Sequence, residues 1–197
     1  MKTSSLALVL LAATAAPALA QSAGDMTFGF GIGYVAPKSG NGTLAGAESD
    51  IGDSVRPTIT FEYFVRDNIG IEVLGALPFK HSIDLGGARI GSTSQLPPTV
   101  SVNYHIPTSG PITPFVGLGV NFTKFYDDKS SLGELSIDDS WGLAAHLGMD
   151  YALSDKGALR MDLRYLDIDS DVKLNGAKVG RVEVDPLVAG VSYIMKF

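Results

Sequence analysis

The sequence predicts an all-β protein, an eight-stranded antiparallel transmembrane β-barrel of the outer membrane. Three observations predict it: an export signal at the N-terminus, a two-residue alternation of side chains in eight later segments, and connectors that alternate between short and long. The chain has 197 residues, of which 45% are hydrophobic and 18% charged. This length and composition suit one folded domain after export.

The first twenty residues have the layout of a secretory signal peptide. Lys2 supplies the positive charge, residues 6–16 are uncharged and mostly apolar, and Ala18-Leu19-Ala20 forms a small-x-small cleavage site. A retained membrane anchor is the competing interpretation, but the apolar run is much shorter than the roughly 20 residues that span a bilayer. We therefore expect residues 1–20 to be cleaved and residues 21–197 to form the barrel in the outer membrane.

Eight segments of the remaining chain alternate with the period of a β-strand. In each segment one face is large and apolar, and the other carries small, polar or charged side chains. The segments are residues 26–35, 55–65, 69–80, 96–106, 115–122, 140–151, 159–166 and 187–197. Most match the roughly 9–11 residues of a tilted membrane strand, and their ends are rich in aromatic residues. A soluble sandwich would have shorter strands with its charges outside.

The connectors indicate how the strands are ordered across the membrane. Residues 66–68, 107–111 and 154–157 form short connectors, whereas residues 37–54, 86–95, 127–139 and 175–180 form longer ones. Outer-membrane barrels have short periplasmic turns and long external loops. Both ends of the mature chain are therefore expected on the periplasmic side.

Charged residues on the lumen face gather near the short turns. They are Glu62, Glu72, Asp150, Arg160, Asp162, Arg164 and Lys196. Isolated charges would be costly in a barrel interior, so mixed signs at one level predict a paired network that closes the periplasmic floor. Stabilisation of the barrel and gating of the lumen are both open as its role.

Nearer the outer end, the same face becomes apolar. We expect an apolar vestibule, open to the outside, that is lined by Val35, Leu74, Pro78, Pro97, Leu166 and Val188. Proline has no backbone N–H to donate to a neighbouring strand. Pro78, Pro97 and Pro98 are therefore a candidate lateral exit between the third and fourth strands.

Several patterns associated with other chemistry do not hold. The chain has no cysteine, and its net charge of −6 disfavours a nucleic-acid partner. Residues 31–36 fit a loose G-x-G-x-x-A pattern, but a loop rather than a helix follows. Asp167, Asp169 and Asp171 begin like a calcium loop without its required glycine and glutamate, which leaves only a looser divalent site open.

A catalytic centre is not predicted either. The histidines, His81, His105 and His146, are scattered, and His105 and His146 are interpreted as lumen polar groups. Ser140 and His146 share a strand face but lie roughly 20 Å apart along it, too far for a triad. We therefore expect no enzyme activity, no cofactor and no metal.

Four segments resemble the OmpW family of bacterial outer-membrane proteins: residues 67–81, 96–99, 114–121 and 139–142. The resemblance implies a narrow apolar channel for uptake of small hydrophobic molecules. The terminal Phe197 resembles the signal of barrel-assembly-machinery substrates. Implied partners are this machinery, outer-membrane lipids and lipopolysaccharide, and hydrophobic solutes. The alternative is a structural or surface-interaction barrel that acts through its extracellular loops.

Overall fold

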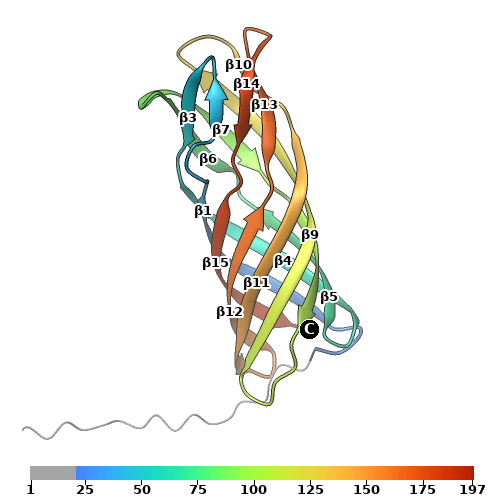
Figure 1. The fold of residues 1–197 in the computed structure, drawn as a ribbon. Helices are drawn as coiled ribbons and strands as arrows, with labels where there is room; N and C mark the ends of the chain where they lie inside the picture. Colours follow the sequence, from blue (N-terminus) through green and yellow to red (C-terminus); the bar gives the residue numbers. More distant parts are fainter. Residues whose placement is uncertain (1–20) are drawn as a thin grey trace, which may run out of the picture.

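The structure is a computed structural model that describes residues 21–197, so the expected signal peptide lies outside the described residues. Eight strands form a closed antiparallel barrel: β1 (Met26–Ala36), β4 (Ser54–Arg66), β5 (Ile69–Ala76), β8 (Thr99–His105), β9 (Ile112–Ser130), β11 (Ser140–Ser154), β12 (Gly157–Leu166) and β15 (Leu187–Lys196). Each strand pairs with the next in this order, and β15 pairs with β1 to close the wall (Figure 1). The predicted fold class is confirmed.

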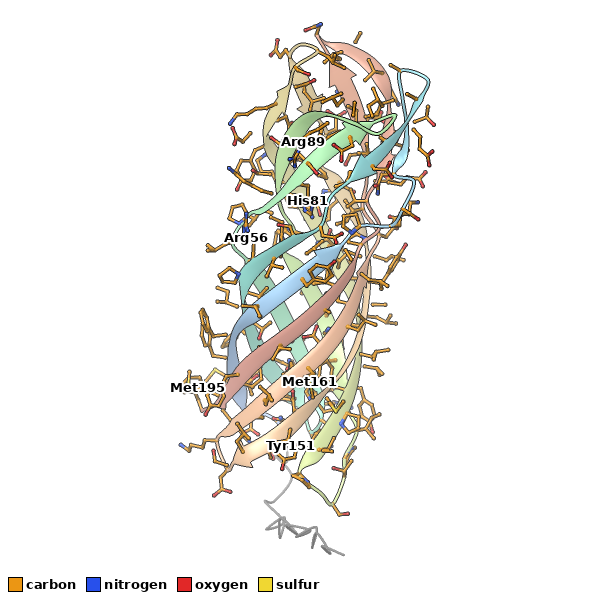
Figure 2. All side chains as sticks on the ribbon, turned by 90° about the vertical axis from the view of Figure 1, so that its left-hand side faces the viewer. Arg56, His81, Arg89, Tyr151, Met161 and Met195 are labelled. Atoms are coloured by element: carbon orange, nitrogen blue, oxygen red, sulfur yellow. The ribbon has the colours of Figure 1, made fainter. Side chains whose placement is uncertain are left out.

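The barrel reverses the side-chain distribution of a soluble protein. Its outer surface carries large apolar residues such as Leu118, 72% exposed, whereas charged residues such as Glu62 are buried inside. Figure 2 shows Met161, Met195 and Tyr151 on the lower part of the barrel, where this apolar outer band lies. Such a surface is stable only against lipid. Within residues 21–197, no helix is long and apolar enough to cross a membrane.

Short turns and extended strands lie at opposite ends of the barrel. At the turn end, β4 joins β5, β8 joins β9 and β11 joins β12, and the C-terminus lies there as well (Figure 1). At the loop end, the wall is prolonged by further strands: β2 (Gly42–Leu44), β3 (Ala47–Ile51), β6 (Phe79–Leu85), β7 (Ala88–Leu96), β10 (Leu135–Ile137), β13 (Asp169–Leu174) and β14 (Ala177–Glu183). Much of the predicted long loops is therefore β-sheet.

The expected single strand over residues 69–80 is wrong, because β5 ends before Leu77 and β6 begins at Phe79. In the β5–β8 ladder Leu74 is opposite Thr99, and an unbroken register would place Pro78 opposite Gln95. Instead Phe79 is opposite Gln95, so one additional residue is accommodated on this side. A shift of one residue exchanges the two faces of a strand. Phe79 consequently points inward, not to lipid, and is 2% exposed.

Candidate solute chamber and its ionic floor

An ion-pair network crosses the lumen in the half of the barrel nearer the turn end. At its centre Arg160 makes a two-pronged contact with Asp150, with Nε 2.7 Å from Oδ1 and Nη2 2.9 Å from Oδ2. Its Nη1 donates to Glu72 Oε2 at 2.7 Å, and Nη2 lies 3.3 Å from Glu62 Oε2. All four side chains are at most 3% exposed. One guanidinium therefore holds three carboxylates that come from three strands.

Arg164 extends this network toward the loop end. Its Nη2 donates to Glu72 Oε1 at 2.8 Å and lies 4.0 Å from Asp162 Oδ2. The six residues Glu62, Glu72, Asp150, Arg160, Asp162 and Arg164 are here called the ionic floor. Lys196 was expected among them, but its Nζ lies 2.6 Å from Asp25 Oδ2, and its side chain is 19% exposed. It belongs to an ion pair near the chain ends.

Uncharged and aromatic side chains contact the six residues of the ionic floor. Asn103 Nδ2 donates to Glu62 Oε1 at 2.9 Å, so its Oδ1 is left to accept from His146 Nε2 at 2.5 Å. His105 Nε2 lies 3.0 Å from Glu62 Oε1. The rings of Phe64 and Phe115 pack on His105, and Arg160 lies 4.4 Å from the centre of the Phe115 ring. These side chains thus pack around the buried charges and supply hydrogen-bond partners to them. Buried charges are stable only with such partners.

Sequence reasoning placed the two histidines in the lumen but did not predict that Asn103, Phe64 and Phe115 contact the ionic floor or its histidines. Phe64 alternates on β4 in step with the predicted charge Glu62, and Asn103 alternates on β8 in step with His105, so the alternation of side chains was the available signal. Which of the inward residues touch across the lumen is set by the stagger of strands distant in sequence. That stagger is visible only in the closed barrel.

The next level of the lumen is a small cavity of about 30 Å³. Leu74, Thr58 and Thr60 line it together with Glu72 and Arg164. This volume is comparable to the share of one water molecule in the liquid. Leu74 thus lies at the boundary between the ionic floor and the apolar residues beyond it.

Beyond this cavity, a cluster of buried apolar side chains lies in the barrel toward the loop end, and the region that it lines is called the outer chamber. The cluster comprises Val35, Leu44, Ile51, Phe79, Ile83, Phe125, Ile137, Ala144, Leu166, Ile168, Val172, Val182, Val184 and Val188. Three predicted vestibule residues, Val35, Leu166 and Val188, meet in it. The expectation of an open cup is wrong for this conformation, because Val35 and Leu166 are 1% and 2% exposed.

The predicted lateral exit coincides with an interruption of the wall. The β5–β8 ladder ends at Leu74 and Thr99, and the β6–β7 ladder begins at Phe79 and Gln95. Within residues 21–197, neither ladder pairs residues 75–78 with residues 96–98; we call this stretch the wall break. The backbone N–H of Leu77 donates instead to Pro57 O, on the other neighbouring strand.

The outer surface is hollowed at the wall break. A depression of about 480 Å³ is lined by apolar side chains and proline rings, including Leu77, Leu96 and Pro98. Ala76 lines this depression and also packs against the outer chamber. Pro78 is half-buried at the same level, and Pro97 is buried. One residue of the wall therefore separates the apolar interior from the lipid-facing hollow.

A second interruption, between β12 and β13 and between β14 and β15, is different. Tyr165 is opposite Leu187 on one side of it and Asp169 is opposite Glu183 on the other, so the register continues unchanged. Backbone hydrogen bonds from Leu166 to Pro186 and from Val184 to Ile168 bridge the gap. Lys38 adds ion pairs to Glu183 and Asp185, and these bonds raise the pKa of its ammonium group. Of these two interruptions in the described part of the chain, the wall break is the one without such bridging.

The acidic stretch beyond β12 forms ion pairs with basic side chains of β14. Asp169 pairs with Arg181, and Asp171 Oδ2 lies 2.5 Å from Lys178 Nζ. The hydrogen bond from Lys178 holds the pKa of Asp171 below its usual value. Among the residues described, 21–197, no group of three or more His, Cys, Asp or Glu side chains could hold a metal ion. The looser divalent site left open by the sequence is therefore not supported.

The family follows from comparison with known proteins, because a model of the OmpW family matches residues 22–197. The chain belongs to the OmpW family. Outer membrane protein W of Vibrio cholerae is 34% identical over 96% of each chain. The crystal structure of OprG from Pseudomonas aeruginosa superposes with a TM-score of 0.80 at 30% identity, covering 91% of this chain and 99% of OprG.

A more distant relative of this OmpW-family barrel has a name that refers to metabolism. The dibenzothiophene metabolism operon protein PahQ of Pseudomonas aeruginosa is 26% identical over 78% of this chain and 77% of its own length. The Vibrio cholerae relative and OprG are both named as outer-membrane proteins. The OmpW-family barrel described here is accordingly a protein of the bacterial outer membrane.

Proposed function

We propose that this OmpW-family barrel is a passive conduit that takes small hydrophobic molecules from outside the cell and releases them sideways into the membrane, without enzymatic chemistry. The observation that carries the proposal is the position of Ala76, which lies between the outer chamber and the lipid-facing hollow. An apolar solute in the outer chamber would therefore need to pass only one side-chain layer at the wall break to reach lipid.

The ionic floor supports a sideways path over an axial one. A solute that continued along the barrel axis would have to separate buried ion pairs, and separating a buried pair costs several kcal/mol. It would also leave a lipid-like environment for water. The wall break demands neither step, because its residues are apolar and its two ladders are already apart.

The name of the relative PahQ agrees with apolar solutes, since dibenzothiophene is an aromatic molecule without charge. The same reasoning assigns outer-membrane lipids as the neighbours of the exposed apolar band and small apolar solutes as the cargo. Phe197 at the end of the closing strand is our proposed contact for the barrel-assembly machinery.

The test compares two variants that add the same bulk. Ala76→Trp fills the wall break, whereas Ala145→Trp adds the indole to the exposed outer face of β11. Uptake of a small hydrocarbon into liposomes is measured per inserted barrel. We expect Ala76→Trp to lower the rate several-fold and Ala145→Trp to leave it near the wild-type value.

Two outcomes contradict parts of the proposal. Equal rates for the two variants would refute the sideways path. A wild-type rate no higher than that of protein-free liposomes would refute transport altogether, and the surface-interaction barrel, acting through its extracellular loops, would replace it.

A further inference from the structure

Buried polar atoms of Gln95 and His81, in the outer part of the barrel, have no hydrogen-bond partner among the described residues. Gln95 and His81 are 1% and 2% exposed. Among residues 21–197, no group forms a hydrogen bond with either amide atom of Gln95 or with Nε2 of His81. A buried polar group without a partner loses much more free energy than a paired one gains, so such atoms call for an explanation.

These two side chains are neighbours on the inner face of the wall, directly beyond the wall break. Gln95 is opposite Phe79, and His81 is opposite Thr93 on the same pair of strands. Gln95 and His81 are therefore diagonal neighbours, about 7–8 Å apart at the backbone, within reach of long side chains. Their polar ends can meet one small group in the barrel interior. Figure 2 shows His81 in the upper part of the barrel, above Arg56.

The surroundings of the pair are aromatic. The Phe79 ring stacks on His81 with 6.4 Å between ring centres, and Phe125 is opposite Gln95 on β9. Phe79 and Phe125 both belong to the outer chamber. A molecule in contact with the two polar ends would thus have part of its surface against these two aromatic rings.

The hydrogen-bonding character of His81 is fixed by its other nitrogen. Nδ1 lies 2.6 Å from the carbonyl oxygen of Gly52, and because a carbonyl only accepts, Nδ1 carries the proton. Burial lowers the pKa of His81, which favours the neutral ring. Nε2 then presents a lone pair, whereas the Gln95 amide offers both donor and acceptor atoms.

We infer that His81 and Gln95 form a recognition subsite for one hydroxyl group on an otherwise apolar solute. The hydroxyl proton is donated to His81 Nε2, and the hydroxyl oxygen accepts from Gln95 Nε2. A ketone can use only the glutamine, because it has no proton to donate to His81 Nε2. The inference rests on the proposed function and narrows its solutes to small alcohols and phenols that enter the outer chamber.

Binding is measured on the folded full-length mature barrel in lipid nanodiscs, separately from uptake. The probes are cyclohexanol, cyclohexanone and methylcyclohexane, and the reporter is the ¹⁵N resonance of His81 Nε2. We expect cyclohexanol to shift this resonance and to bind about three- to tenfold more tightly than the other two probes, as the loss of one neutral hydrogen bond predicts.

Variants separate the subsite from general packing. Gln95→Leu and His81→Phe should each remove the preference for cyclohexanol while retaining binding of methylcyclohexane. Ser170→Ala is the matched control, because the buried Ser170 hydroxyl likewise has no hydrogen-bond partner within residues 21–197 but lies on β13. It should leave the preference unchanged.

The outcomes are distinguishable from those of the uptake experiment. Equal affinity for the three probes in the wild-type barrel, or a cyclohexanol preference that survives Gln95→Leu, overturns the inference and indicates that the two side chains hold only water. Neither result depends on whether the barrel transports hydrocarbon. Failure of Ala76→Trp to slow uptake would refute the sideways path while leaving this subsite intact.

Discussion

Arg160 Nη1 donates to Glu72 Oε2 at 2.7 Å across the full width of the lumen. The two residues are 88 positions apart, on β12 and β5. In the closed order of the barrel these strands are diametrically opposite, with three strands between them in either direction. The ion pair thus blocks the axis and ties two opposite walls together.

Replacement of Arg160 should be strongly destabilising. Arg160→Met leaves Glu62, Glu72 and Asp150 buried without their shared cation, and we expect a loss of about 3–5 kcal/mol in the free energy of unfolding. Urea unfolding in lipid vesicles measures this loss of stability. The conductance of planar bilayers should also rise, because the guanidinium that crosses the lumen is gone. Lys178→Met, which removes an exposed ion pair, is the control with little expected change. Equal stabilities would contradict the assigned role of Arg160.

The floor should also be sensitive to one added methyl group that changes no charge. A Cβ at Gly117 would lie 2.1 Å from His146 Nε2 and 2.3 Å from Asn103 Oδ1, whereas one at Gly75 would meet Ile59 at an ordinary 3.5 Å. We expect Gly117→Ala to cost roughly 1–3 kcal/mol by forcing this buried hydrogen bond apart. Gly75→Ala is the matched control, and thermal unfolding followed by gel mobility compares the two. A tolerated Gly117→Ala would show that the floor can repack.

Deletion of Pro78 should repair the wall break. Without this residue, Phe79 would come opposite Gln95 in the same register as the β5–β8 ladder, and its inward orientation would be kept. We expect slower hydrogen exchange at residues 76–79 and slower hydrocarbon uptake. Pro186→Val, at the interruption that is already bridged, should alter neither quantity. Uptake that is undiminished although exchange has slowed would exclude the wall break as the path.

His81 should make stability depend on pH in a defined direction. Its pKa in the folded barrel is lowered by burial, so between that value and about 6.5 the unfolded chain binds a proton that the folded chain does not. The effect of this proton on the free energy of unfolding is therefore absent above pH 6.5. As the pH falls below 6.5, it increasingly destabilises the folded barrel. Arg56 and Asp53 face His81 with opposite influences, and Arg56 is the stronger.

The measurement is the free energy of unfolding of wild-type barrel minus that of His81→Gln, taken from pH 8 to pH 5. The subtraction removes the titration of all other groups. We expect the difference to become less favourable to the wild type below pH 6.5. A constant difference would mean that His81 titrates alike in both states.

The alternation of side chains made the closed barrel predictable, because a buried and a lipid-facing surface impose opposite chemistry on successive residues. It failed at Phe79, where one additional residue at Pro78 reversed the faces. A local pattern cannot reveal such a shift, since Phe79 is as suitable for lipid as for an apolar interior. The strands at the loop end were missed for a related reason. In residues 177–183 each of the two alternating sets contains a valine together with a charged residue, so alternation carries no clear signal there.

The ionic floor was predictable as a set of inward charges, and its partners were not. Parity placed Glu72 and Arg160 on the lumen face, but their pairing depends on barrel closure. Lys196 has the same parity and is at the end of its strand, where Asp25 is available. Gln95 and His81 give no warning in the sequence, because only the surroundings show that their polar atoms lack partners.

Strand β9 runs unbroken from Ile112 to Ser130 and pairs with β8 near the turn end and with β7 near the loop end. Beside the wall break, β9 is therefore the one continuous strand that joins β8, in the membrane-spanning part of the barrel, to β7 at the loop end. Separation of β5 from β8 at the wall break would therefore leave the loop-end strand β7 attached, through β9, to the membrane-spanning part of the barrel.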